Sequence, residues 1–157
     1  MHLPELPGFF RVALRAIECA GRDPALTAWV GAVIVRGGAV IGSGANRIGT
    51  NTFVHRTWPR HRTACVSVHA EIDAIFKTRR RVDLRGCRMY VVRVTRAGIT
   101  AGSRPCTMCM DLLGRYGFTD VNYTVDGGGW TSEVVPHPRW IRTTRRRRSQ
   151  LRAKPSK

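Results

Sequence analysis

Two short motifs constrain this chain more than any other feature. One is H-A-E, which begins at His69, and the other is P-C-T-M-C, whose cysteines are Cys106 and Cys109. Because the cysteines are three positions apart, their sulfurs point to the same side of the first turn of a helix. Histidine and cysteine bind zinc, and three such ligands leave one position of a tetrahedral ion open to water. Glu71 can then move protons between that water and a substrate, so the motifs predict a catalytic Zn²⁺ site.

Two other uses of a C-x-x-C pair are open: a structural zinc site and a thiol redox pair. A structural zinc needs a fourth closing ligand, and neither Cys65 nor Cys87 has a partner at comparable spacing. Redox chemistry has no need of an H-x-E motif upstream. The combination therefore favours catalytic zinc over both alternatives.

The pattern of apolar residues predicts an α/β fold with one mixed sheet and helices on both of its faces. A length of 157 residues fits one domain. The region from Asn46 to Val68 has no clean period and is predicted to be a long loop, a kind of segment that is often functional. The expected elements are a helix at 6–20, strands at 29–35 and 39–42, a helix at 69–78, a strand at 88–94, a helix at 106–116, and strands at 119–125 and 130–135.

The charge of the chain indicates a polyanionic partner. Lys and Arg number 27 against 10 acidic residues, a net charge of +17, and eight of the basic residues lie in 142–157. We predict a zinc-binding domain at 1–142 and an Arg-rich tail at 143–157 that is disordered when free. Nucleic acid is the first partner to expect and nucleotide phosphate the second; solvated charge without a partner is the alternative. The candidate nucleic-acid contacts are Arg145, Arg146, Arg147 and Arg148.

The composition also bears on the compartment. No apolar run is long enough to span a membrane, so no membrane partner is expected. The N-terminus carries Glu5 and two prolines and lacks the basic start of a signal peptide. Five cysteines are an odd count, and two of them resemble metal ligands. A reducing, intracellular compartment, cytoplasmic or nuclear, is therefore expected.

H-x-E followed by P-C-x-x-C is a known signature of zinc deaminases. The chain resembles the cytidine deaminase superfamily, in the branch with H-A-E that includes deoxycytidylate deaminases and tRNA adenosine deaminases. The resemblance covers about residues 8–125 and includes Val30–Val35, Val40–Gly42 and Asn46 as well as both motifs. It implies a three-layer fold with a mixed five-stranded sheet, a catalytic zinc and hydrolytic deamination of a nucleobase. We also expect a homo-oligomer.

The resemblance assigns further residues to the substrate site. Asn46 falls where the family places an asparagine that contacts the substrate near its sugar; a turn residue at a strand end is the alternative. The backbone N–H of Ala70 and the carbonyl region near Arg104 are expected to orient the polar edge of the base.

The chain departs from the family in two places. The loop before His69 is longer than in tRNA adenosine deaminases, and it is basic and aromatic. Its Trp58 could stack on a base or pack the loop onto the body, whereas His55 and His61 are better explained as solvated loop residues than as ligands. The turn at 126–129 predicts that the last two strands form an antiparallel hairpin. With Ser103-Arg104 before Pro105, this hairpin resembles deaminase-like proteins of DNA viruses and phages, so a virus-encoded origin is expected.

We therefore predict zinc-dependent hydrolytic deamination of a nucleobase, cytosine to uracil, in a (deoxy)cytidine nucleotide or in nucleic acid. The family favours the free nucleotide and the charge favours nucleic acid. The competing hypothesis is a nucleic-acid-binding or packaging protein built on the same fold. The intact Glu71 argues for the enzyme, since a binding protein has no use for it, and the tail argues for the binding protein.

Overall fold

The apolar, β-branched run at 29–35 forms β1, an inner strand of the sheet between β2 and β5. The computed structural model describes residues 6–49 and 67–137. Strand β1 is buried along most of its length, as an apolar run without alternation requires. The elements in chain order are α1 (Gly8–Ala20), β1 (Ala28–Arg36), β2 (Ala39–Ala45), β3 (Arg47–Ile48), β4 (Ser67–Val68), α3 (Ala70–Thr78), β5 (Arg88–Thr95), β6 (Thr100–Ala101), α4 (Thr107–Tyr116), β7 (Asp120–Thr124) and β8 (Trp130–Val134).

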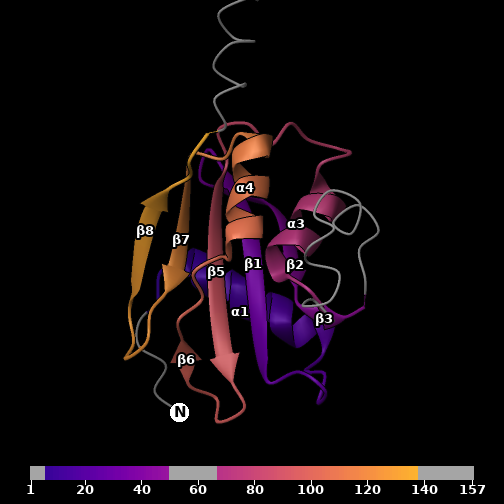
Figure 1. The fold of residues 1–157 in the computed structure, drawn as a ribbon, viewed down its shortest axis with the longest axis vertical. Coiled ribbons are helices and arrows are strands. Elements are labelled where there is room, and N and C mark those ends of the chain that lie inside the picture. Colours follow the sequence, from indigo (N-terminus) through magenta and orange to yellow (C-terminus); the bar gives the residue numbers. More distant parts are fainter. Residues whose placement is uncertain (1–5, 50–66, 138–157) are drawn as a thin grey trace, which may run out of the picture.

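The structure has three layers, with α1 on one face of the sheet and α3 and α4 on the other (Figure 1). The strand order is β2-β1-β5-β7-β8. Strand β1 pairs antiparallel with β2 and β5, β7 runs parallel to β5, and β8 returns antiparallel to β7. The predicted mixed sheet with helices on both faces is confirmed, and so is the hairpin formed by its last two strands.

The sheet has a sixth strand, β6, in a segment that was predicted to be loop throughout. Gly98 has a φ of 77° and donates its N–H to the carbonyl of Thr95, so the chain turns back at the end of β5. Thr100 and Ala101 then pair antiparallel with Val94 and Arg93. A two-residue strand leaves no periodic signal, because its pairing depends on the neighbouring strand and not on its own sequence. Strand β6 thus pairs with β5 at Val94 and Arg93, beyond the residues of β5 that pair with β7.

Two apolar clusters hold the layers together. The larger lies beneath α3 and α4, and the smaller lies beneath α1. In α3, Ile72 and Ile75 are buried, and Phe76 packs against the larger cluster while partly exposed. Each helix therefore contributes the apolar side that its 3.6-residue period predicts.

The first turn of α3 is held tightly against the end of β2. A Cβ added to Gly44 would lie 2.3 Å from the backbone nitrogen of Ala74 and 2.6 Å from the carbonyl oxygen of Ala70. The buried Asp73 carboxylate accepts a hydrogen bond from the N–H of Ala45 at 3.3 Å and forms an ion pair with Lys77. These contacts fix the start of α3 relative to the sheet.

Gly44→Ala is expected to destabilise the protein by about 3 kcal/mol, because its methyl group meets backbone atoms that cannot rotate away. Urea unfolding monitored by circular dichroism measures the loss. Gly8→Ala is the matched control, since the nearest atom to its added Cβ is a flexible Arg11 side-chain nitrogen at 3.9 Å. The control should keep or slightly raise the stability. Equal unfolding midpoints for the two variants would contradict the tight contact.

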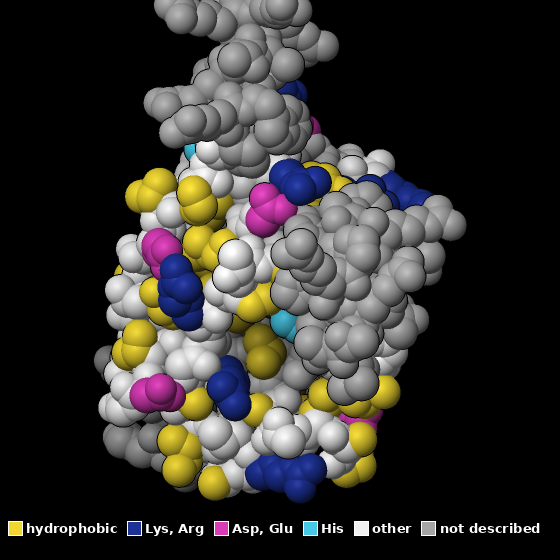
Figure 2. All heavy atoms as spheres, in the orientation of Figure 1, with side chains coloured by type: hydrophobic (Ala, Val, Ile, Leu, Met, Phe, Trp, Pro, Cys, Tyr) yellow, Lys and Arg dark blue, Asp and Glu magenta, His cyan; other side chains and the backbone are white. Residues whose placement is uncertain are grey.

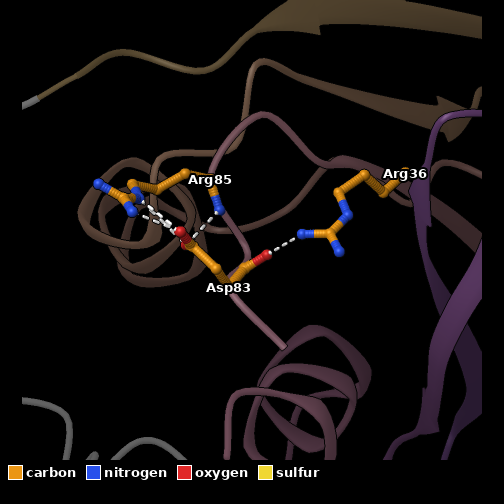
Figure 3. Close-up of polar contacts among 3 residues, drawn as sticks. All are labelled: Arg36, Asp83 and Arg85. Atoms are coloured by element: carbon orange, nitrogen blue, oxygen red, sulfur yellow. Dashed lines mark hydrogen bonds and ion pairs between the residues drawn. The ribbon is translucent and has the colours of Figure 1, made fainter. Parts of the chain in front are cut away.

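The far end of α3 is tied to the sheet through Asp83 (Figure 3). Its carboxylate accepts hydrogen bonds from the backbone and guanidinium of Arg85, and these lower its pKa. Its carbonyl oxygen accepts a hydrogen bond from Arg36 Nη1 at 2.7 Å. These contacts are structural and join the end of β1 to the link between α3 and β5.

Among the described residues, no helix has the length and apolar character that crossing a membrane requires.

Candidate metal centre and active-site pocket

The two motifs place their ligand residues at the N-termini of two adjacent helices. His69 is the N-cap of α3 and Cys106 is the N-cap of α4, each with extended backbone angles. Neither side chain caps its own helix. Cys109 is buried within the first turn of α4. The side chains of both motifs are therefore directed to the space between the helix ends.

The three side chains lie at distances that suit one zinc ion. His69 Nδ1 is 3.6 Å from Cys106 Sγ and 3.4 Å from Cys109 Sγ, and all three ligand atoms lie within 4.8 Å of one another. Zn–N and Zn–S bonds at a tetrahedral angle imply an N···S separation of about 3.6 Å. Within residues 6–49 and 67–137 this is the one group of three such donors that could hold a metal.

The electrostatics of the site favour a thiolate. A hydrogen bond from Cys109, together with His69, lowers the pKa of Cys106 to about 4. The N-terminus of a helix carries partial positive charge, which stabilises an anionic sulfur in the same way. Because the thiolate is the form that binds metal, Cys106 is ready to bind at neutral pH without first losing a proton.

Glu71 lies beside this group and is only 4% exposed. Burial raises the pKa of its carboxyl group, and the neighbouring His69 opposes the rise. A carboxyl group held within reach of a reacting water can accept a proton and return it. Its chemistry is that of an acid–base residue.

These side chains open into a pocket of about 370 Å³. That volume lies within the range of roughly 300–1,000 Å³ that is typical of small-molecule sites. Among the residues that the structure describes, Glu71 is the one acidic residue in its lining. The lining consists of Thr27, Ala28, Val30, Asn46, Ser67, His69, Ala70, Glu71, Arg93, Gly102, Ser103, Arg104 and Cys106.

Asn46 lines the pocket while its side-chain amide is engaged with β1. Its Oδ1 accepts a hydrogen bond from the N–H of Val30 at 2.7 Å, and its Nδ2 donates to the carbonyl of Ala28 at 3.0 Å. Asn46 thus has the strand-end role that was its structural alternative. Its contact with substrate stays a prediction, as does that of Ala70, which also lines the pocket.

The guanidinium of Arg104 is held by the last hairpin. It donates to both carboxylate oxygens of Glu133, at 2.8 and 2.7 Å, in a bidentate ion pair. Tyr123 donates its hydroxyl to the same carboxylate. Arg104 also lines the pocket, and the expected role of its carbonyl region in orienting the base stays a prediction.

A buried hydroxyl pair fixes the loop that leads to Cys106. Ser103 Oγ donates to the carbonyl of Val91 at 2.8 Å and lies 2.9 Å from Thr124 Oγ1. The N–H of Thr124 in turn donates to Ser103 Oγ at 3.0 Å. Sequence analysis missed Thr124 and Glu133, because neither belongs to a motif and both approach the site only through the pairing of β7 and β8 with the sheet.

The remaining predicted site residues lie outside the described ranges. They are Trp58, His55 and His61 of the long loop and Arg145, Arg146, Arg147 and Arg148 of the tail.

A three-layer α/β fold with a His/Cys/Cys group and a buried glutamate between two helix N-termini defines the class of zinc deaminases. Residues 6–125 match the sequence model of the cytidine and deoxycytidylate deaminase zinc-binding region, and the chain belongs to that family. Zinc is accordingly its cofactor. No curated protein sequence matches the chain.

Solved structures share the fold. The cytidine deaminase of Burkholderia pseudomallei is 19% identical, with a TM-score of 0.55, over 81% of this chain and 90% of its own. The dCMP deaminase of cyanophage S-TIM5 is 18% identical, with a TM-score of 0.52, over 74% of this chain and 79% of its own. The cytidine deaminase of Mycobacterium leprae is 20% identical, with a TM-score of 0.50, over 78% of this chain and 87% of its own. At such identities the likeness is one of fold.

Proposed function

We propose that this zinc deaminase converts cytosine to uracil in a free (deoxy)cytidine nucleotide. The observation that carries the proposal is the buried Glu71 carboxyl group in a pocket that also contains the His69 and Cys106 side chains. A pocket of this size accommodates a single base with its sugar. Glu71, its acid–base group, lies beside the residues that would hold the zinc.

The zinc would be held by His69, Cys106 and Cys109. The distances between their ligand atoms match those expected around a tetrahedral zinc ion. When bound there, the ion lowers the pKa of water and so supplies a nucleophile near neutral pH. Two soft thiolates and an imidazole suit zinc better than a hard cation such as Mg²⁺.

Glu71 carries the protons of the reaction. It accepts one from the attacking water as the oxygen bonds to C4 of the ring, and it passes that proton to N3. It then transfers the second proton of the water to the amino group, the C4–N bond breaks with its electron pair leaving on nitrogen, and ammonia departs. The N–H of Ala70 and the carbonyl of Arg104 orient the base, a role supported by the place of both residues in the pocket lining.

The distribution of charge over the described residues of one face supports a free nucleotide over a polynucleotide. In the described part of the face shown in Figure 2, basic side chains are separated from one another, and some lie directly beside acidic ones. Arg104 pairs with Glu133, and Arg115 pairs with Asp111. A nucleic-acid backbone is usually tracked by a continuous basic stripe. The S-TIM5 enzyme, whose fold this chain shares, has been crystallised with dCMP and dUMP.

Ammonia release from a panel of substrates tests the proposal. The panel contains cytidine, deoxycytidine, CMP, dCMP, a cytosine-containing single-stranded DNA and an RNA. We expect the free nucleotides to be turned over with the highest kcat/KM. Preferential turnover of either polymer would contradict the proposal.

Nucleic-acid binding by the tail is a second candidate function, favoured by the eight basic residues in 142–157. Deleting residues 143–157 is expected to weaken binding to DNA and RNA of any sequence and to flatten its salt dependence, because each phosphate contact releases condensed counterions. Fluorescence anisotropy at two salt concentrations measures this effect. Turnover of a free nucleotide should stay unchanged, since Glu71 and the three metal ligands all lie outside the deleted segment. Equal affinity of the two proteins at low salt would remove the tail's binding role.

A further inference from the structure

We propose that Arg93 binds the 5′-phosphate of the substrate and thereby makes the nucleotide, rather than the unphosphorylated nucleoside, the preferred substrate. The inference rests on the function proposed above and adds a residue that decides between two classes of small substrate. It depends on three features of the structure: the face of the sheet on which Arg93 lies, the lack of a protein partner for its charge in the described ranges, and the composition of the pocket.

Arg93 lies on the face of the sheet that carries the metal ligands. Side chains alternate along a strand, so Arg93 shares a face with Met89 and Val91. Those two residues are buried in the cluster beneath α3 and α4. Arg93 is one repeat further along β5, where the strand is paired with β6, and there it is exposed and lines the pocket. The sheet thus extends past the helix N-termini and presents a cation at the edge of the site.

The charge of Arg93 is available to a ligand. Its backbone N–H approaches Thr124 Oγ1 at 3.4 Å, whereas its guanidinium has no hydrogen bond or ion pair with any of the described residues. Arg104, the other arginine in the lining, is already paired with both carboxylate oxygens of Glu133. Of the two arginines that line the pocket within the described residues, Arg93 is therefore the one that an anion would meet.

Among the described residues, no carboxylate at the rim of the pocket would compete for Arg93. Glu71, the acidic residue of the lining, is buried beside the metal ligands. Asp126 lies near the same loop, but its carboxylate accepts a hydrogen bond from the N–H of Gly102 at 2.7 Å and it is not part of the lining. A nucleotide could therefore bind with its nucleobase beside Glu71 and its phosphate at Arg93, at separate points of one cavity.

A guanidinium is well suited to this role because its planar, forked donors match two phosphate oxygens at once. A nucleoside has no group that can replace this contact. Loss of a hydrogen bond to a charged group corresponds to a change of about 10- to 100-fold in affinity. The effect should appear mainly in KM, since the phosphate is remote from the reacting atoms and binds equally in the ground and transition states.

The test compares kcat/KM for dCMP and deoxycytidine in four proteins: wild type, Arg93→Ala, Arg93→Lys and Arg11→Ala. Arg11 is an exposed arginine of α1, on the opposite face of the sheet, and controls for the lost charge. Arg93→Ala should lower the ratio of the two kcat/KM values by about 10- to 100-fold through KM. Arg93→Lys should retain part of the preference, and Arg11→Ala should retain all of it.

Three results would overturn the proposal. They are an unchanged ratio in Arg93→Ala, whether or not both kcat/KM values fall, a fall of the ratio through kcat with KM unchanged, and an equal fall of the ratio in Arg11→Ala. Calorimetric binding of dCMP and deoxycytidine to wild type and Arg93→Ala separates this test from the activity. If the wild type deaminates neither compound, the proposed function fails. In that case, the role of Arg93 stands if wild type binds dCMP more tightly than deoxycytidine and Arg93→Ala shows no such preference. Any other binding result overturns it.

Discussion

Glu71→Gln should lower kcat by about 10²- to 10⁴-fold, the range expected when a positioned acid–base group is removed. The amide has nearly the shape of the carboxyl group, so the buried site keeps its packing, but it cannot accept a proton from water and return it to the base. Ammonia release measures the loss, and elemental analysis should find the same zinc content as in wild type.

The matched control is Glu18→Gln, an equivalent change on the exposed side of α1. It should leave turnover at the wild-type level. If Glu71→Gln retained activity within tenfold of wild type, Glu71 would not be the proton carrier. If it lost its zinc as well, the effect on turnover would report on the metal site instead.

The second large effect is expected at the metal ligands. A Cys106→Ser, Cys109→Ser double variant should fall from one zinc per chain to almost none, because a serine hydroxyl stays protonated at neutral pH and is a poor zinc ligand. Deamination should be lost with the metal. Elemental analysis of the purified protein and ammonia release measure the two effects.

Cys19→Ser is the control for this variant, since Cys19 is an exposed cysteine of α1 that lies outside the metal group. It should keep both zinc and activity. Full zinc occupancy in the double variant would show that other residues hold the ion.

The parts of the site that could be predicted from sequence are those encoded by short local spacing. H-A-E and P-C-T-M-C each place their side chains at the start of one helix, so their mutual arrangement follows once two helices begin side by side. The structure does bring His69, Cys106 and Cys109 together. The hairpin of β7 and β8 was predictable in the same way, from the Asp-Gly-Gly-Gly turn that precedes Trp130.

The parts that could not be predicted depend on register between strands. Arg93 lies in the predicted strand at 88–94, but in the sequence it looks like one more basic residue of a strongly basic chain. Its place in the pocket lining follows from the pairing of β5 with β1 and β6 and from the position of the helices over the sheet. Glu133 and Thr124 likewise act through the position of the last hairpin beside the Ser103–Arg104 segment. These are contacts between residues that are distant in the sequence, so no local sequence pattern predicts them.

The metal ligands come from two helices, and this gives the ion a second consequence. His69 and Cys106 are 37 positions apart in the chain, so a bound zinc acts as a cross-link that closes a long loop. Each tenfold rise in free zinc above the dissociation constant adds about 1.4 kcal/mol to the free energy of unfolding. Steady-state levels of the protein in a cell should therefore follow zinc supply, because proteases remove the unfolded chain that zinc starvation releases.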